Sequence, residues 1–313
     1  MNKRWFRLAA LSFLLNSAVF GQACSFPPDT RTWDEVAADF VATEAKSPFN
    51  NDDGPRLKAL DPKKALKFLL PYLGKQHPKG LRLKAIGALG DCAFQEASPA
   101  LSAIAKDVSE DEDLRGGSLN PGLRYMKSPA AVETAAAVAD DKSRYVRISA
   151  YWVLSEHGSD RALGVLEKRI QSKGLSEVEL ENLINALYYS KSGCAGKIIF
   201  SNCDFSTLPN DENLLSSYAR IMMEFRIPDA QQTMLRIAKM PGRELKTRYA
   251  LCYFKSFPRE DVVPTLIEYI NKHNSEGLYD TVTAFANSAS ISESSKKTLN
   301  EFLTSGKVKK DEN

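Results

Sequence analysis

The stretch that decides the fold is residues 141–170, which read DKSRYVRISAYWVLSEHGSDRALGVLEKRI. Its apolar residues recur every three or four positions, which is the period of an α-helix. The tripeptide His157-Gly158-Ser159 interrupts this pattern, because glycine commonly ends a helix and serine commonly begins one. The stretch therefore predicts two helices joined by a short turn.

Ala150 is the small residue at the centre of the first of these helices, and alanines recur at nearly constant spacing after it. They are Ala186, Ala219, Ala250 and Ala284, and Ala85 lies close to two periods before Ala150. A nearly constant spacing in this range predicts stacked helical hairpins. The small side chain lets neighbouring helices approach closely.

Residues 141–170 also resemble a HEAT repeat, whose pattern is Asp, then Val-Arg, then spaced Ala and Leu, then Gly. The matching residues are Asp141, Val146, Arg147, Ala150, Leu154, Gly158, Ala162, Leu166 and Ile170. Residues 81–104 match less fully, and residues 244–270 match weakly. The resemblance covers about residues 60–305 and implies an all-α fold, a right-handed α-solenoid of HEAT-like hairpins. It does not indicate a function, because such solenoids serve many unrelated tasks.

Residues 1–23 have the layout of a secretory signal peptide. The positive charges at its start are Lys3, Arg4 and Arg7. A mostly apolar stretch follows over residues 8–20, and the small residues Gly21 and Ala23 come after it. The apolar part is shorter than the about 20 residues that a membrane-spanning helix needs. We therefore expect an exported protein, periplasmic or secreted, with no transmembrane span.

Cys24 is a candidate lipidation site, because Gly21-Gln22-Ala23-Cys24 resembles a bacterial lipoprotein box. The box lacks its usual branched apolar residue at the first position. Cleavage after Ala23 or after Gly21 without lipidation therefore remains an alternative. A lipid at Cys24 would attach the protein to the cell envelope.

The charge balance excludes one class of partner. The chain has 42 Lys and Arg residues against 39 Asp and Glu residues, and removing the leader's three basic residues leaves 39 of each. Proteins that bind nucleic acid generally carry a clear basic excess. We therefore expect no nucleic-acid partner.

The rest of the chain divides into three parts. Residues 24–60 predict an N-terminal capping helix and a linker, with a capping box at Thr32 and Glu35. Residues 61–305 form the HEAT-like repeat domain, and residues 306–313 are expected to be a flexible tail. Residues 108–128 interrupt the period with an acidic run and several turn residues, so a loop or a degenerate helix is expected there.

Cys194 and Cys203 lie nine positions apart in a segment that contains glycine. In an oxidising compartment we expect a local disulfide between them, with two free thiols as the alternative. Cys92 and Cys252 fall in apolar helical segments and are expected to be core residues.

No catalytic motif, cofactor motif or metal-ligand spacing is present, and His77, His157 and His273 lie far apart. We therefore expect no catalytic residue, no cofactor, no metal and no enzyme activity. The iron-dependent hydroxylase with HEAT-like repeats carries His-Glu pairs, whereas this chain has only the reversed Glu156-His157. Bilin lyases of this architecture are cytosolic, which the export signal opposes.

The remaining candidate is a binding surface on the second helices of the pairs, where Tyr and Arg are typical of binding hot spots. The candidate protein-binding residues are Arg82, Arg147, Tyr151, Tyr218, Arg220, Arg248 and Tyr253. The predicted function is a non-catalytic scaffold or adaptor that binds another protein. A periplasmic immunity-type inhibitor of a toxin and a polysaccharide-associated accessory factor of the envelope are alternatives, and an enzyme with an unrecognised site is a third class.

Overall fold

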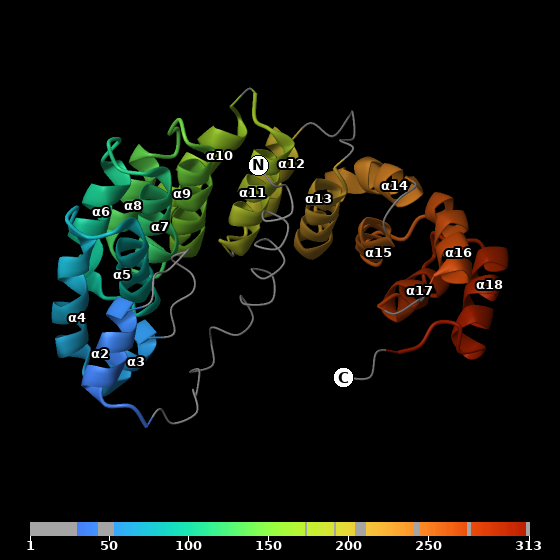
Figure 1. Ribbon diagram of the computed structural model, residues 1–313. Coiled ribbons are helices and arrows are strands. Elements are labelled where there is room, and N and C mark those ends of the chain that lie inside the picture. The colour runs from blue at the N-terminus through green and yellow to red at the C-terminus, as the bar shows by residue number, and fades with distance from the viewer. Residues whose placement is uncertain are drawn as a thin grey trace.

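The computed structural model describes residues 30–42, 53–172, 174–190, 192–203, 211–240, 244–273 and 277–310. The described part is helical throughout and contains no strand. The helices stack side by side into an open arch (Figure 1). The predicted all-α solenoid is therefore confirmed.

The arch has two layers of helices (Figure 1). The inner layer consists of α5 (Lys79–Asp91), α7 (Glu112–Gly117) with η3 (Ser118–Leu123), α9 (Arg144–His157), α11 (Glu177–Tyr189), α13 (Glu212–Phe225), α15 (Glu244–Tyr253) and α17 (Tyr279–Ala286). The outer layer consists of α4 (Pro62–Leu69), α6 (Ser98–Lys106), α8 (Pro129–Ala137), α10 (Asp160–Ile170), α12 (Ala195–Asn202), α14 (Gln231–Lys239), α16 (Val263–Lys272) and α18 (Glu293–Thr304). Short 3-10 turns lie beside several of them, at η1 (Leu70–Leu73), η2 (Gln95–Ala97), η4 (Pro228–Ala230) and η5 (Glu260–Val262).

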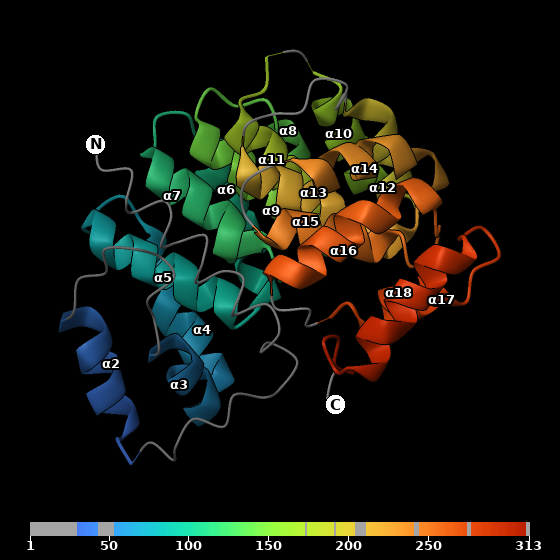
Figure 2. The same ribbon diagram turned by 90° about the vertical axis from the view of Figure 1, so that its right-hand side faces the viewer.

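The two ends of the arch are closed differently (Figure 1, Figure 2). At one end lie α2 (Trp33–Ala42) and α3 (Asp53–Leu60), and at the other lie α17 and α18. The capping box at the start of α2 is present, since the Thr32 amide donates to Glu35 Oε2 at 2.6 Å. Beyond α18, Val308 is buried and its amide bonds the Phe302 carbonyl, so this part of the predicted tail packs on the last helix.

The repeat alanines lie where the layers meet. Ala85, Ala150, Ala186, Ala219 and Ala250 are fully buried. Ala284 is only half-buried. Two inner-layer elements pack closely at Gly90 of α5, where an added Cβ atom would lie 2.5 Å from the Pro121 carbonyl oxygen of η3.

A ladder of arginine–carboxylate pairs joins successive inner helices. Arg82 donates to both oxygens of Glu110 at 2.8 and 2.9 Å, and Arg147 donates to both oxygens of Glu179 at 2.8 and 2.9 Å. Between them, Arg115 pairs with Asp141 in the same forked manner. Because these groups are largely buried, each pair fixes one repeat on the next.

The interruption expected at residues 108–128 is an inner-layer element. α7 and η3 occupy the place of the missing repeat helix, and residues 114–123 are buried throughout. Asn120 has a non-helical backbone before the cis Asn120–Pro121 bond, so the element bends there. Of the two alternatives, the structure has the degenerate helix and not the loop.

The predicted disulfide between Cys194 and Cys203 is wrong for the described residues, because both thiols are free. The segment between them is not a loop but helix α12, with Cys194 directly before it and Cys203 directly after it. A rise of 1.5 Å per residue puts the two Cα atoms roughly 13 Å apart. A disulfide needs Cα atoms within about 7 Å. The predicted signal peptide and Cys24 lie outside the described residues.

Candidate functional site

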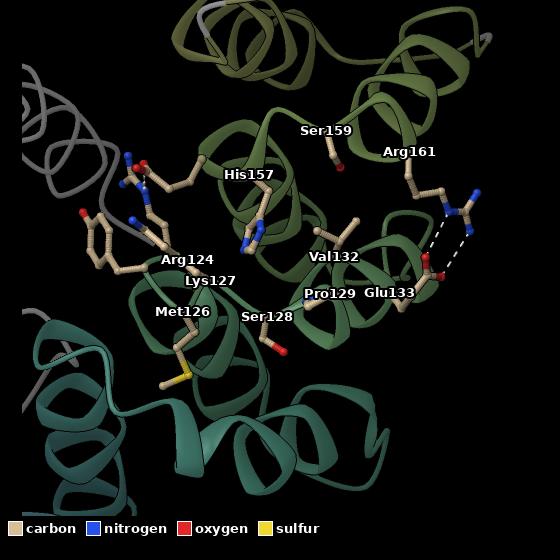
Figure 3. A pocket seen from close by; sticks show the side chains of 12 residues that line it. Arg124, Met126, Lys127, Ser128, Pro129, Val132, Glu133, His157, Ser159 and Arg161 are labelled. Carbon is tan, nitrogen blue, oxygen red and sulfur yellow. Dashed lines mark hydrogen bonds and ion pairs between the residues drawn. The ribbon is translucent and has the colours of Figure 1, made fainter.

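A pocket lies at the edge of the arch where inner helices turn into outer helices. Its volume is about 610 Å³. The lining residues are Arg124, Tyr125, Met126, Lys127, Ser128, Pro129, Val132, Glu133, Glu156, His157, Ser159 and Arg161. They come from the turn before α8, the first turn of α8, the end of α9 and the start of α10 (Figure 3).

Two capped helix starts shape this pocket. Ser128 Oγ accepts a hydrogen bond from the Ala130 amide, and Ser159 Oγ accepts one from the Ala162 amide. Gly158 has a φ of +55°, which ends α9 and allows α10 to start immediately. The short turn places His157 and Ser159 at one rim of the pocket, opposite Ser128.

His157 contributes an imidazole that points toward the middle of the lining residues (Figure 3). Its Nε2 atom is buried and makes no hydrogen bond. Burial lowers the pKa of His157, while the charge of Glu156 and a hydrogen bond with the Met126 backbone act in the opposite direction with smaller effect. Burial therefore favours the neutral ring, which can accept a proton or a hydrogen bond.

The charged residues of the pocket are three cations and two carboxylates. Arg161 pairs with Glu133 at 3.2 Å, and Arg124 pairs with Glu156 at 3.4 Å. Lys127 is exposed and forms no ion pair with any residue that the structure describes. The pocket therefore has one positive charge more than its own carboxylates balance.

Sequence analysis did not identify the residues of this pocket as one site. We interpreted His157 as a structural helix end, and Lys127, Ser128 and Ser159 were not singled out. One signal was available, because Ser128 and Ser159 both directly precede helix starts and stand one repeat period apart.

The candidate protein-binding residues fall into two groups. Arg82, Arg147, Tyr151, Tyr218 and Tyr253 lie in the interior or in the ladder between repeats. Tyr253, for example, donates its hydroxyl proton to the Ile227 carbonyl at 2.6 Å. Only Arg220 and Arg248 are half-exposed and free of carboxylate partners within the described residues.

A second polar cluster surrounds Glu179. Arg147, Arg169 and Tyr151 all donate to its carboxylate, at distances from 2.7 to 2.9 Å. Burial alone would raise the pKa of Glu179, but these donors lower it to about 2. Both carboxylate oxygens are occupied, so the cluster joins α9, α10 and α11 and leaves no open coordination for a ligand.

Neither a metal-binding group nor a helix that could span a membrane is present among the described residues. No group of three or more His, Cys, Asp or Glu side chains there could hold a metal ion. No helix among them is long and apolar enough to cross a membrane.

Comparison with known proteins adds one likeness. No family model and no curated protein matches the chain. Among solved structures, the chain is similar to the complex of CpcE and CpcF of phycocyanin lyase from Nostoc sp. PCC7120, with 17% identity and a TM-score of 0.44. The likeness covers 91% of this chain and 99% of that chain. At this TM-score and identity the likeness carries no argument about this chain.

This finding corrects two predictions. The non-catalytic scaffold or adaptor, with its inhibitor and accessory-factor alternatives, is wrong, and so is the prediction that the protein is not an enzyme. Both rested on missing motifs, yet the similar solved structure is a lyase complex. That structure is a complex of two proteins, and the protein partner expected for this chain stays a prediction.

Proposed function

We propose that the protein is an enzyme that binds a small carboxylate-bearing molecule in the pocket at the starts of α8 and α10. His157 acts there as the proton acceptor, and Lys127 holds the carboxylate. The observation that carries the proposal is a neutral imidazole with an unbonded Nε2 atom, beside a cation that has no carboxylate partner among the described residues.

The charge of the pocket supports an anionic ligand. A carboxylate that enters the pocket loses hydration, and this loss must be offset by charge or by hydrogen bonds. Lys127 supplies a charge, and Ser128 and Ser159 each keep a hydroxyl proton, because both accept rather than donate in their caps.

The imidazole supports proton transfer as the chemistry. A general base must be unprotonated at the working pH and must not be occupied by a stronger hydrogen-bond partner. His157 meets both conditions, because burial lowers its pKa and Nε2 is unbonded. Nε2 is buried in the free protein, so the imidazole must turn for this atom to reach a ligand in the pocket. The reaction class is removal of a proton from the carbon next to the carboxylate, with Lys127 stabilising the negative charge that develops.

Hydrogen exchange tests this chemistry without knowledge of the complete reaction. The protein is incubated in D₂O with a panel of small carboxylates, and deuterium at the carbon next to the carboxylate is followed by NMR. We expect faster exchange for at least one compound, lost by about 100-fold in His157→Gln, in line with the usual contribution of a general base. Lys272→Gln on α16, which removes a charge far from the pocket, should leave the rate unchanged.

Two outcomes would contradict the role of His157 as the base. If no compound exchanges faster than in buffer, or if His157→Gln exchanges as fast as the unchanged protein, the assignment of His157 as the base fails. Circular dichroism of each variant shows whether the fold is retained.

We also propose that the protein is exported. The support is the basic start of residues 1–23, the apolar stretch after it and the small residues at its end, all of which lie outside the described residues. Cell fractionation followed by intact-mass measurement tests this, and we expect a shortened chain outside the cytoplasm. A full-length chain in the cytoplasm would contradict export, and an added lipid mass would assign Cys24 as its acceptor.

A further inference from the structure

The outer helix α4 carries three lysines close together on its exposed side. Lys63, Lys64 and Lys67 are all exposed, and residues 62–69 contain no acidic residue. Residues three and four apart on a helix are neighbours on its surface, so Lys67 lies beside both of the others. Within the described part of the chain, none of the three side chains forms an ion pair. These three residues are called the lysine cluster below.

The lysine cluster does not stabilise its own helix. The N-terminal end of a helix carries a partial positive charge, so Lys63 and Lys64 stand unfavourably in the first turn of α4. Like charges four residues apart, as at Lys63 and Lys67, also repel each other. Asp61 offsets part of this repulsion, because its carboxylate caps the helix and accepts the Lys64 amide proton at 3.0 Å. The remaining positive charge faces solvent and is available to an anionic partner.

Apolar side chains are exposed at the same end of the arch. The ring of Trp33 in α2 is half-exposed, and Lys64 Nζ lies 4.4 Å from its centre. Phe68 of α4 packs edge-on against this ring, with ring centres 6.1 Å apart. Val41 of α2 and Leu60 of α3 are 43% and 48% exposed. The end of the arch formed by α2, α3 and α4 therefore presents both cations and apolar side chains (Figure 1).

The predicted leader precedes this end of the arch in the chain. Cys24, the candidate lipidation site, stands nine residues before Trp33. Nine residues span at most about 32 Å when fully extended. A lipid on Cys24 would therefore hold α2 within that distance of a membrane surface.

We propose that the lysine cluster and Trp33 bind the surface of a membrane that contains anionic phospholipid. Each lysine close to an anionic lipid surface adds an attraction equivalent to about fivefold in affinity. Lysine acts as a point charge on a flexible stem, which suits headgroups without fixed positions, whereas arginine is typical of fixed carboxylates in proteins. Tryptophan favours the boundary between lipid and water, because its ring is apolar and its N–H group is polar. This surface is distinct from the pocket, since none of these residues lines it.

The test measures sedimentation of the full chain with vesicles of phosphatidylcholine, with and without phosphatidylglycerol, at low salt. Every variant keeps the predicted leader, so the leader contributes equally to each. We expect stronger binding to the vesicles that contain phosphatidylglycerol, reduced more than about tenfold when all three lysines of the cluster are replaced with glutamine. Trp33→Ala should also weaken binding, and its effect should persist at high salt, because salt screens charges and not apolar contacts.

The matched control removes three exposed lysines from other outer helices. Lys168→Gln, Lys239→Gln and Lys297→Gln together change the net charge equally, on α10, α14 and α18. This control should bind the anionic vesicles within about twofold of the unchanged protein, because its lysines lie apart from each other. Urea denaturation followed by circular dichroism should show the cluster variant at least as stable as the unchanged protein, because repulsion within α4 is removed.

Three results would overturn the proposal. They are equal binding to vesicles with and without phosphatidylglycerol, unchanged binding of the cluster variant, and an equal loss of binding in the control. Poly-glutamate serves as a competitor, and release of the protein from anionic vesicles at equal charge concentration would assign the lysine cluster to an acidic protein instead. Proton exchange in the pocket should be unchanged in the cluster variant, so a failure here is separable from a failure of the proposed function.

Discussion

Single residues set the distance between repeats, and Gly90 is a clear case because its close neighbour is backbone. A Cβ atom at this position would lie 2.5 Å from the Pro121 carbonyl oxygen, which belongs to the backbone of η3 and cannot rotate away. Gly164 in α10 is the opposite case, because nothing lies within 4 Å of the Cβ atom that could be added there. The same substitution therefore has opposite consequences at the two positions.

We predict that Gly90→Ala lowers the free energy of unfolding by about 1–3 kcal/mol, because overpacking must push α5 away from η3. Gly164→Ala should raise it by up to about 1 kcal/mol, because alanine favours the helix more than glycine does. Urea denaturation followed by circular dichroism measures both. A Gly90→Ala variant as stable as the unchanged protein would show that the two elements are not in close contact.

Sequence analysis placed individual residues correctly in the repeat that best matches the HEAT pattern, residues 141–170. Ala150 and Arg147 stand in the best-matching repeat, and the structure places both where the repeat pattern requires. The pocket residues were missed for a physical reason. The roles of His157 and Lys127 depend on two turns from successive repeats meeting in space, which no local pattern encodes.

At the scale of elements, the inner helices are held in register by buried arginine–carboxylate pairs. Arg115 is the member that the sequence analysis missed, although it stands one repeat period after Arg82 and one before Arg147. The acidic run and the Gly-Gly pair on either side of it are typical of a loop. In the structure Gly116 lies against the ring of Tyr145, so the glycine there serves close packing and not a turn.

We predict that Arg115→Gln lowers the free energy of unfolding by about 3–5 kcal/mol, because Asp141 is left buried without its partner. Arg161→Gln is the matched control, since its pair with Glu133 has the same forked geometry but both side chains are more than half exposed. Arg161→Gln should lower the free energy of unfolding by less than about 1 kcal/mol. Urea denaturation measures both variants, and equal losses would contradict a structural role for the ladder.

Elements were also mispredicted where helix and loop patterns compete. Residues 195–202 contain a glycine and few charges, and they lie between two cysteines. This composition favoured a loop with a disulfide. The segment is helical instead, because a helix buries Ala195, Gly196 and Ile199 against the neighbouring repeat. A Cβ atom on Gly196 would lie 2.6 Å from Phe225.

At the scale of the whole molecule, the solenoid places the pocket at one edge of the arch, where turns of successive repeats meet. The ring centre of Trp152 lies 5.1 Å from the guanidinium carbon of Arg124 in this pocket and 5.7 Å from the ring centre of Tyr189 on the next inner helix. The period of the repeat predicted the arch, but it did not predict which turns meet to form the pocket.

The most direct test of the account is the pKa of His157, measured by NMR of the ring signals with and without a bound anion. His157→Gln identifies its signal among the three histidines. We predict a pKa below 6.5 in the free protein, because burial disfavours the charged ring. A carboxylate that binds beside Lys127 should raise this pKa, because a nearby negative charge favours the imidazolium. A pKa at or above 6.5 in the free protein, or one that no carboxylate shifts, would contradict the account.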